Sequence, residues 1–118
     1  MPHQFAPGDD LIFQLESGLG LLRVIAIDGE GVDTVWHLLA YDEFFPDVQS
    51  AERALNQNDE LKVREPHMAL TARAFERTPA ARLGNRPLHD DELSGYRAWL
   101  TSERKVSDRS ALLLLGIR

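Results

Sequence analysis

The chain contains 118 residues, of which 43% are hydrophobic and 27% are charged, and its formal net charge is −6. This length suits one domain with a substantial core, and the composition lies outside the range of disordered chains, so residues 1–118 are predicted to form a single domain. Cysteine is absent, which excludes disulfides, thiolate nucleophiles and cysteine-ligated metal centres and favours a reducing compartment.

The first third of the chain predicts an antiparallel meander. Apolar side chains alternate over residues 10–16, as expected for a half-buried strand. Ser17 and Gly18 then turn the chain into a second strand over residues 19–27, where β-branched residues cluster. Gly20 is expected to mark a bulge or bend in this strand.

A third strand is expected over residues 32–41, after the turn that begins at Asp28 and Gly29. Its middle does not alternate, which is typical of a central strand buried on both faces. Pro46 or Asp47 then opens a short helix that runs through residue 55.

Between residues 60 and 80 the pattern leaves strand and helix open. Residues 61–65 and 68–71 are read as strands on either side of Pro66, because the residue before a proline favours extended backbone. Residues 78–79 and 84–87 have the proline and glycine content of loops.

The clearest helix runs from Asp90 to Ser102, with Asp90 as its N-cap and an acidic first turn. Gly95 lies off the apolar stripe of this helix. Residues 111–115 are expected to form a buried final strand that closes the sheet. The stripe that should dock on the sheet consists of Leu93, Tyr96, Trp99 and Leu100.

These elements predict an α+β fold. We expect a curved antiparallel sheet, or a partly open SH3-like barrel, from the first half of the chain, with one main helix from the second half packed on it.

The charge is divided unevenly along the chain. Residues 1–60 contain two basic and twelve acidic residues, a balance of −10, whereas residues 61–118 contain eleven basic and seven acidic residues, a balance of +4. The halves either attract each other within one fold or offer a surface to a partner of opposite charge. Both alternatives remain open from the sequence.

The N-terminal residues lack the basic start and apolar run of a secretory signal. Nor does any apolar stretch approach the roughly 20 residues that a membrane-spanning helix requires. We therefore expect a cytoplasmic protein that makes no membrane contact.

Sequence motifs for cofactors are absent. The glycines fall in hairpin turns rather than in a phosphate loop, and the four histidines lack the i, i+4 spacing of a helical metal pair. We predict neither a cofactor nor a metal. His37, on a strand, is expected to be a structural residue with a hydrogen-bonded ring, and catalysis is the alternative.

An acidic group follows the third strand directly: Asp42, Glu43 and Asp47 surround Phe44 and Phe45. Two carboxylates in a cleft can act as acid and base if their surroundings separate their pKa values. The same residues can instead form the rim of a partner-binding surface, or a solvated turn with its aromatic side chains buried. The sequence leaves the three alternatives open.

Four arginines recur through a segment with one aromatic residue, Phe75, and such spacing can follow a phosphate backbone. Ion pairs to the acidic first half are the other interpretation. The four are Arg73, Arg77, Arg82 and Arg86.

The opening segment carries a resemblance to a known family. It reads Pro-Gly-Asp-Asp-Leu-Ile-Phe-Gln-Leu at residues 7–15 and Ser-Gly-Leu-Gly-Leu-Leu-Arg-Val at residues 17–24. This pattern resembles the start of the immunity protein 26 family and related small SH3-like barrels, and the likeness covers residues 7–27. It implies a strongly bent N-terminal sheet and a non-catalytic protein that neutralises a toxin of bacterial competition by binding it.

Charge and resemblance together predict a non-catalytic protein-binding domain that meets a basic protein partner. The alternative is a small nucleic-acid-binding or regulatory module that uses the four arginines, and a third is a hydrolase or isomerase that uses Asp42, Glu43 or His37. The predicted partner-binding residues are Asp42, Glu43, Phe44, Asp47 and Glu52.

Overall fold

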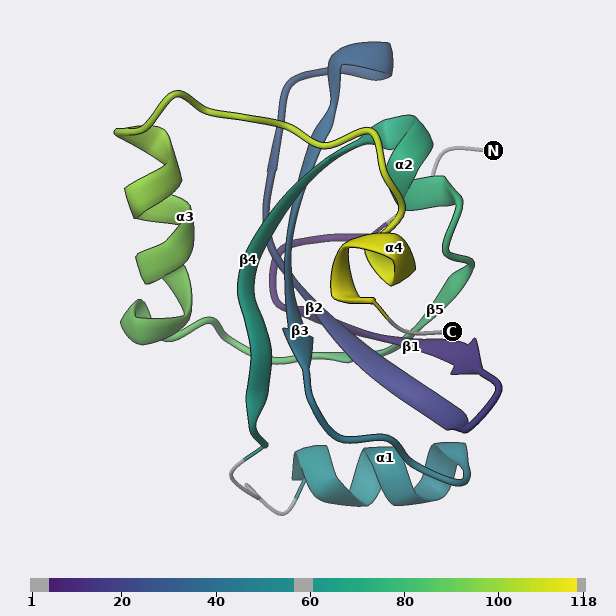
Figure 1. Ribbon diagram of the computed structural model, residues 1–118. Coiled ribbons are helices and arrows are strands. Elements are labelled where there is room, and N and C mark those ends of the chain that lie inside the picture. The colour runs from purple at the N-terminus through teal and green to yellow at the C-terminus, as the bar shows by residue number, and fades with distance from the viewer. Residues whose placement is uncertain (1–4, 57–60, 117–118) are drawn as a thin grey trace.

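The computed structural model of the chain describes residues 5–56 and 61–116 (Figure 1). Its strands are β1 (Asp9–Leu15), β2 (Gly18–Asp28), β3 (Val35–Tyr41), β4 (Val63–Thr71) and β5 (Ala80–Asn85). Its α-helices are α1 (Val48–Asn56), α2 (Ala72–Glu76), α3 (Ser94–Leu100) and α4 (Ala111–Leu115), and two short 3₁₀ turns are η1 (Gly31–Asp33) and η2 (Asp90–Leu93).

The five strands form one open antiparallel sheet in the order β4-β3-β2-β1-β5. Figure 1 shows its strong twist, because β3 and β4 run vertically while β1 runs across them. This arrangement confirms the predicted α+β class and the curved sheet, and it is consistent with a partly open barrel. The predicted meander is β1-β2-β3, continued by β4.

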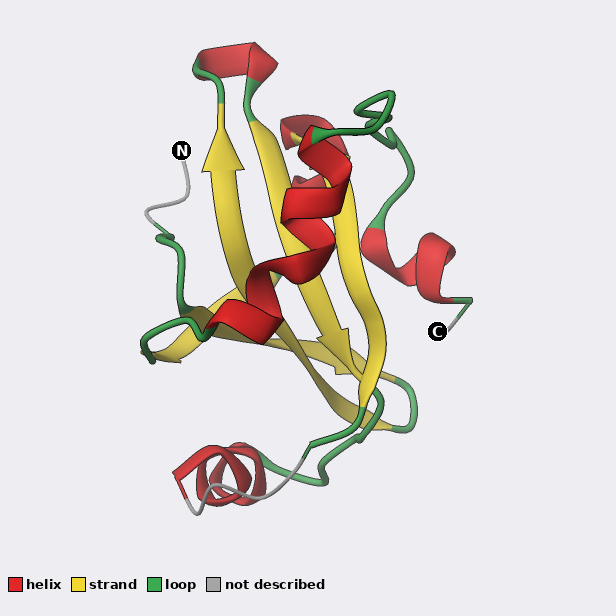
Figure 2. Ribbon diagram, turned by 90° about the vertical axis from the view of Figure 1, so that its left-hand side faces the viewer, coloured by secondary structure: helices red, strands yellow, loops and turns green. Residues whose placement is uncertain are grey.

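The sheet is buried on both faces. One apolar cluster joins alternate side chains of β1 to β4 with α2 and α4, and the other joins the opposite side chains of β1 to β3 with α1. Partly buried Leu93 and Tyr96 pack against this second cluster, which places α3 on the same face as α1. In Figure 1, α3 accordingly lies on one side of the sheet and α2 and α4 on the other, and Figure 2 shows α3 lying across the strands.

The prediction of a bulge at Gly20 is wrong. The register between β2 and β3 shifts between Val24 and Ala26, whereas Gly20 pairs regularly with Phe13. The glycine is needed for a different reason: a Cβ at this position would lie 2.5 Å from Cζ of the Phe13 ring. Gly20 therefore makes room for an aromatic side chain of the core.

The two strands expected on either side of Pro66 are one strand, β4. Its register against β3 shifts between Leu38 and Ala40. Pro66 and His67 of β4 therefore both lie opposite the one residue Leu39 of β3. A bulge of this kind accommodates a proline within a strand, since the missing N–H is not needed in the ladder.

The main helix of the second half begins as η2 and continues as α3, which ends at Leu100. The predicted cap at Asp90 is wrong, because His89 occupies the N-cap and the Glu92 carboxylate accepts a hydrogen bond from the His89 backbone N–H at 3.0 Å. Gly95 also lies against the sheet rather than off the packed face, since a Cβ there would come within 2.7 Å of the His67 Cβ.

The final strand predicted at residues 111–115 is wrong, because these residues form α4. The Ser110 hydroxyl accepts the Leu113 N–H, and Gly116 ends the helix in the left-handed conformation with φ 68°. Both are ordinary helix-capping signals. Strand β5 was not predicted: residues 80–85 contain few large apolar side chains, and their strand character comes from pairing with β1.

Candidate functional site

The acidic loop, residues 42–47, leads from β3 into α1 at one end of the sheet. Phe45 is buried within the cluster beneath α1, whereas Phe44 is 37% exposed. Asp47 accepts the Ser50 N–H at 2.7 Å in the first turn of α1, and this hydrogen bond lowers the pKa of the Asp47 carboxyl. The loop therefore hides one ring in the core and presents the other to solvent.

The backbone of this loop is tied to the sheet. Leu19 and Phe45 exchange two backbone hydrogen bonds of 2.7 and 2.8 Å. Gly18 permits this approach, because a Cβ there would lie 2.8 Å from the Phe45 carbonyl oxygen and its φ is 144°. Phe44 is consequently displayed on a braced loop.

One basic side chain of β4 and the backbone just before β4 contact the acidic loop. Arg64 donates to Asp42 at 3.2 Å, and the Lys62 N–H donates to Glu43 at 3.4 Å. Glu52 is exposed on α1 and has no ion pair among the described residues. Glu43, Asp47 and Glu52 thus form no salt bridge among the described residues, although the charge of Arg53 also helps to lower the pKa of Asp47.

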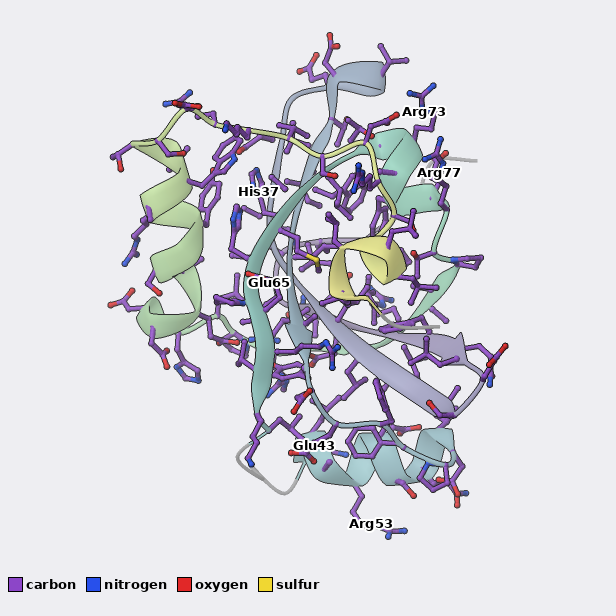
Figure 3. The ribbon with its side chains drawn as sticks, viewed as in Figure 1. His37, Glu43, Arg53, Glu65, Arg73 and Arg77 are labelled. Atoms are coloured by element: carbon purple, nitrogen blue, oxygen red, sulfur yellow. The ribbon has the colours of Figure 1, made fainter. Side chains whose placement is uncertain are left out.

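The four arginines do not form one surface. Arg73 and Arg77 lie on and next to α2, where both donate to Asp108, Arg73 to the carboxylate and Arg77 to the backbone carbonyl. Arg82 is exposed on β5, and Arg86 points inward to the buried Asp10. Figure 3 shows Arg73 and Arg77 at the opposite end of the molecule from Glu43.

A buried ionic network joins the two halves of the chain, and sequence reasoning did not find it. Arg23 is 1% exposed, and its guanidinium donates to Glu92, to Asp10 at 3.3 Å and to three backbone carbonyls. Arg86 donates to the same Asp10 carboxylate at 2.6 and 2.9 Å and to the Tyr41 hydroxyl at 3.2 Å. Two positive and two negative groups therefore balance each other, and because each half supplies one of each sign, the network leaves the charge difference between the halves unchanged.

A second cluster lies between the sheet and α3, around His37 (Figure 3). His37 is fully buried, and its Nε2–H donates to Asp28 at 2.9 Å. Its Nδ1 then accepts from Nε2–H of His67 at 2.9 Å, and the Tyr96 hydroxyl donates to Asp28 at 3.0 Å. Trp99 completes the cluster with its ring edge-on to His37 at a centroid distance of 4.5 Å.

Both imidazoles in this cluster are held neutral. Burial lowers the pKa of His37 and outweighs the opposing effect of the Asp28 carboxylate. Burial and the neighbouring His37 ring lower the pKa of His67 to about 4. With neutral rings, one polarised chain of hydrogen bonds runs from α3 through β2 and β3 to β4.

The arrangement around His37 resembles the orientation of a catalytic imidazole by a carboxylate, but a substrate site also needs space. Four hollows in the described part of the molecule are lined by residues other than His37 and His67. The His37 ring is hydrogen-bonded, as predicted, and within the described residues its partners attach α3 to the sheet.

Comparison with known proteins identifies no relative of this chain. No family model matches it, and searches of curated proteins and of solved structures find no significant match. Among the described residues, no helix is long and apolar enough to cross a membrane, and no group of three or more His, Asp or Glu side chains is arranged to hold a metal ion.

Proposed function

We propose that this protein is a non-catalytic protein-binding domain whose partner carries a basic surface. The contact surface consists of Asp42, Glu43, Phe44, Asp47 and Glu52. The observation that carries this proposal is the exposed Phe44 ring, which stands among carboxylates on a loop that is braced against β2.

This combination has the character of a protein interface. An aromatic side chain held in place loses little conformational entropy on binding, and a rim of charged groups steers a partner of opposite charge. Phe44 supplies the ring, and Glu43 and Glu52 supply carboxylates without an ion pair among the described residues. Asp42, which is paired with Arg64, contributes less to the charge.

The resemblance of residues 7–27 supports a narrower form of the proposal. In that form the partner is a bacterial toxin, and the domain neutralises it in the cytoplasm by binding. A nucleic-acid-binding module has less support, because Arg73 is paired with Asp108 and Arg86 with Asp10.

The test is affinity capture from a lysate of the cells that encode the chain, with and without nuclease. The bait is the wild type or a variant with Glu43→Lys and Glu52→Lys. A matched control carries Glu30→Lys and Asp33→Lys, the same charge change at exposed positions around η1. We expect one basic protein to be retained regardless of nuclease, with affinity reduced about tenfold or more in the first variant only.

Equal retention by both variants would contradict the proposal. Retention that disappears with nuclease would instead favour the arginine-based alternative, because phosphate contacts dominate such binding.

A further inference from the structure

A shallow apolar hollow of about 350 Å³ lies where the β1–β2 hairpin meets β5 and the start of α1. Its lining includes Ile12, Leu19, Val48, Pro79, Ala80 and Ala81. Val48 is 43% exposed, and the alanines present small side chains. The hollow can therefore take up large aliphatic side chains from another molecule.

One wall of this hollow is an edge strand. Among the described residues, β1 is the only strand that pairs with β5. An edge strand offers unpaired N–H and C=O groups along its outer side, and an extended segment can add to it as a further strand. Residues 80–81, at the end nearest the hollow, carry no charged side chain that would oppose such pairing.

The charges around the hollow indicate the chemistry of the segment. Exposed Glu16 lies in the hairpin turn, two residues beyond Gln14 of the lining, and exposed Asp47 immediately precedes Val48. Arg82 is farther along β5, beyond the lining residues. A segment with aliphatic side chains over the hollow and basic side chains beyond Ala80 would match this distribution.

We propose that a partner segment in extended conformation adds to the outer edge of β5, inserts aliphatic side chains into the hollow and places basic side chains near Glu16 and Asp47. This inference rests on the proposed function and extends it, since Asp47 belongs to both surfaces. It defines the recognised feature as a β-strand that is both aliphatic and basic.

The probe is a labelled synthetic peptide with blocked ends and the sequence Lys-Lys-Val-Thr-Val-Thr-Val-Lys-Lys. One control peptide has glutamate in place of every lysine, and a second has proline in place of the central valine, because proline cannot donate a ladder hydrogen bond. Binding is measured by fluorescence anisotropy, and contact is located by NMR shifts of the Ala80 and Ala81 amides.

Two matched variants test the location. Val48→Lys places a cation and removes a branched side chain at the hollow, whereas Val32→Lys makes the same change at a valine that is 92% exposed on η1 and outside this hollow. We expect the lysine peptide to bind the wild type and Val32→Lys alike, and to bind Val48→Lys about tenfold more weakly. Neither control peptide should shift the Ala80 or Ala81 amides.

Three results would overturn the inference: no binding of the lysine peptide at about 1 mM, equal binding of the proline peptide, or equal weakening by both variants. A dimer that Val48→Lys dissociates would also overturn it, by identifying a second copy as the occupant. If the peptide fails while Glu43→Lys with Glu52→Lys still loses the captured protein, the strand-addition site is refuted and the proposed function stands.

Discussion

Acidification should loosen the attachment of α3 to the sheet, because the histidines beneath it are held neutral. The pKa of His67 is about 4 in the folded protein, against 6.5 for an unperturbed histidine. Between these values the unfolded chain binds more protons than the folded chain, so the free energy of unfolding falls as the pH falls from about 6.5 to about 4.

The size of the effect follows from the shift. A pKa lowered from 6.5 to about 4 corresponds to an upper limit of about 3 kcal/mol, at about 1.4 kcal/mol per pKa unit. His67 is only partly buried, and solvent screening reduces this limit to about 1–2 kcal/mol. Most of the loss should occur between about pH 7 and pH 5, where ordinary carboxyl groups contribute little.

The assay is urea denaturation at several pH values, followed by tryptophan fluorescence from Trp36 and Trp99. The comparison is with His67→Gln, which keeps a side chain that can donate to His37 Nδ1 but does not titrate. We expect the wild type to lose about 1 kcal/mol more than the variant between about pH 7 and pH 5.

Identical pH dependence in both proteins would refute this reasoning. An independent check is the titration of the His67 ring by NMR. A measured pKa near 6.5 in the folded protein would show that the ring is not desolvated as the structure indicates.

Three further predictions concern the core and one helix cap, each measured by urea denaturation. Arg23→Met should lose about 3–5 kcal/mol because it leaves the Glu92 carboxylate unpaired in the buried network, and a loss below about 1 kcal/mol would contradict this. Gly20→Ala should lose about 1–3 kcal/mol, since its Cβ would meet the buried Phe13 ring, and unchanged stability would show that the ring can move. Ser110→Ala should lose about 1 kcal/mol through the α4 cap, and no change would mean that packing alone maintains the helix.

Local patterns predicted the first half of the fold well. Alternation indicated β1, β-branched residues indicated β2, an apolar run indicated β3, and glycine turns separated them, because these signals act between residues that are close in the chain. The predicted start of the third strand at residue 32 is wrong, because residues 31–33 form η1 and β3 begins at Val35. Ser110 and Gly116 are equally local signals, because they cap the two ends of α4. The prediction of a strand considered only the five apolar residues between them, and such a short apolar run fits a strand as well as a helix.

The candidate surface was predictable only in part. The acidic loop could be found because its residues are adjacent in the sequence. Its partial neutralisation by Arg64 could not, because Arg64 reaches Asp42 through the pairing of β4 with β3. The exposure of Phe44 and burial of Phe45 likewise depend on the contact between Phe45 and Leu19.

The sequence by itself determined where the strands of the meander and the acidic loop lie along the chain, since both depend on short-range spacing. Only the tertiary structure decided which polar groups meet. Asp28, His37, His67 and Tyr96 come from four elements, and no spacing along the chain relates them. The energy of a buried polar group depends on the partners that folding brings within hydrogen-bond distance, and the order of residues does not specify those partners.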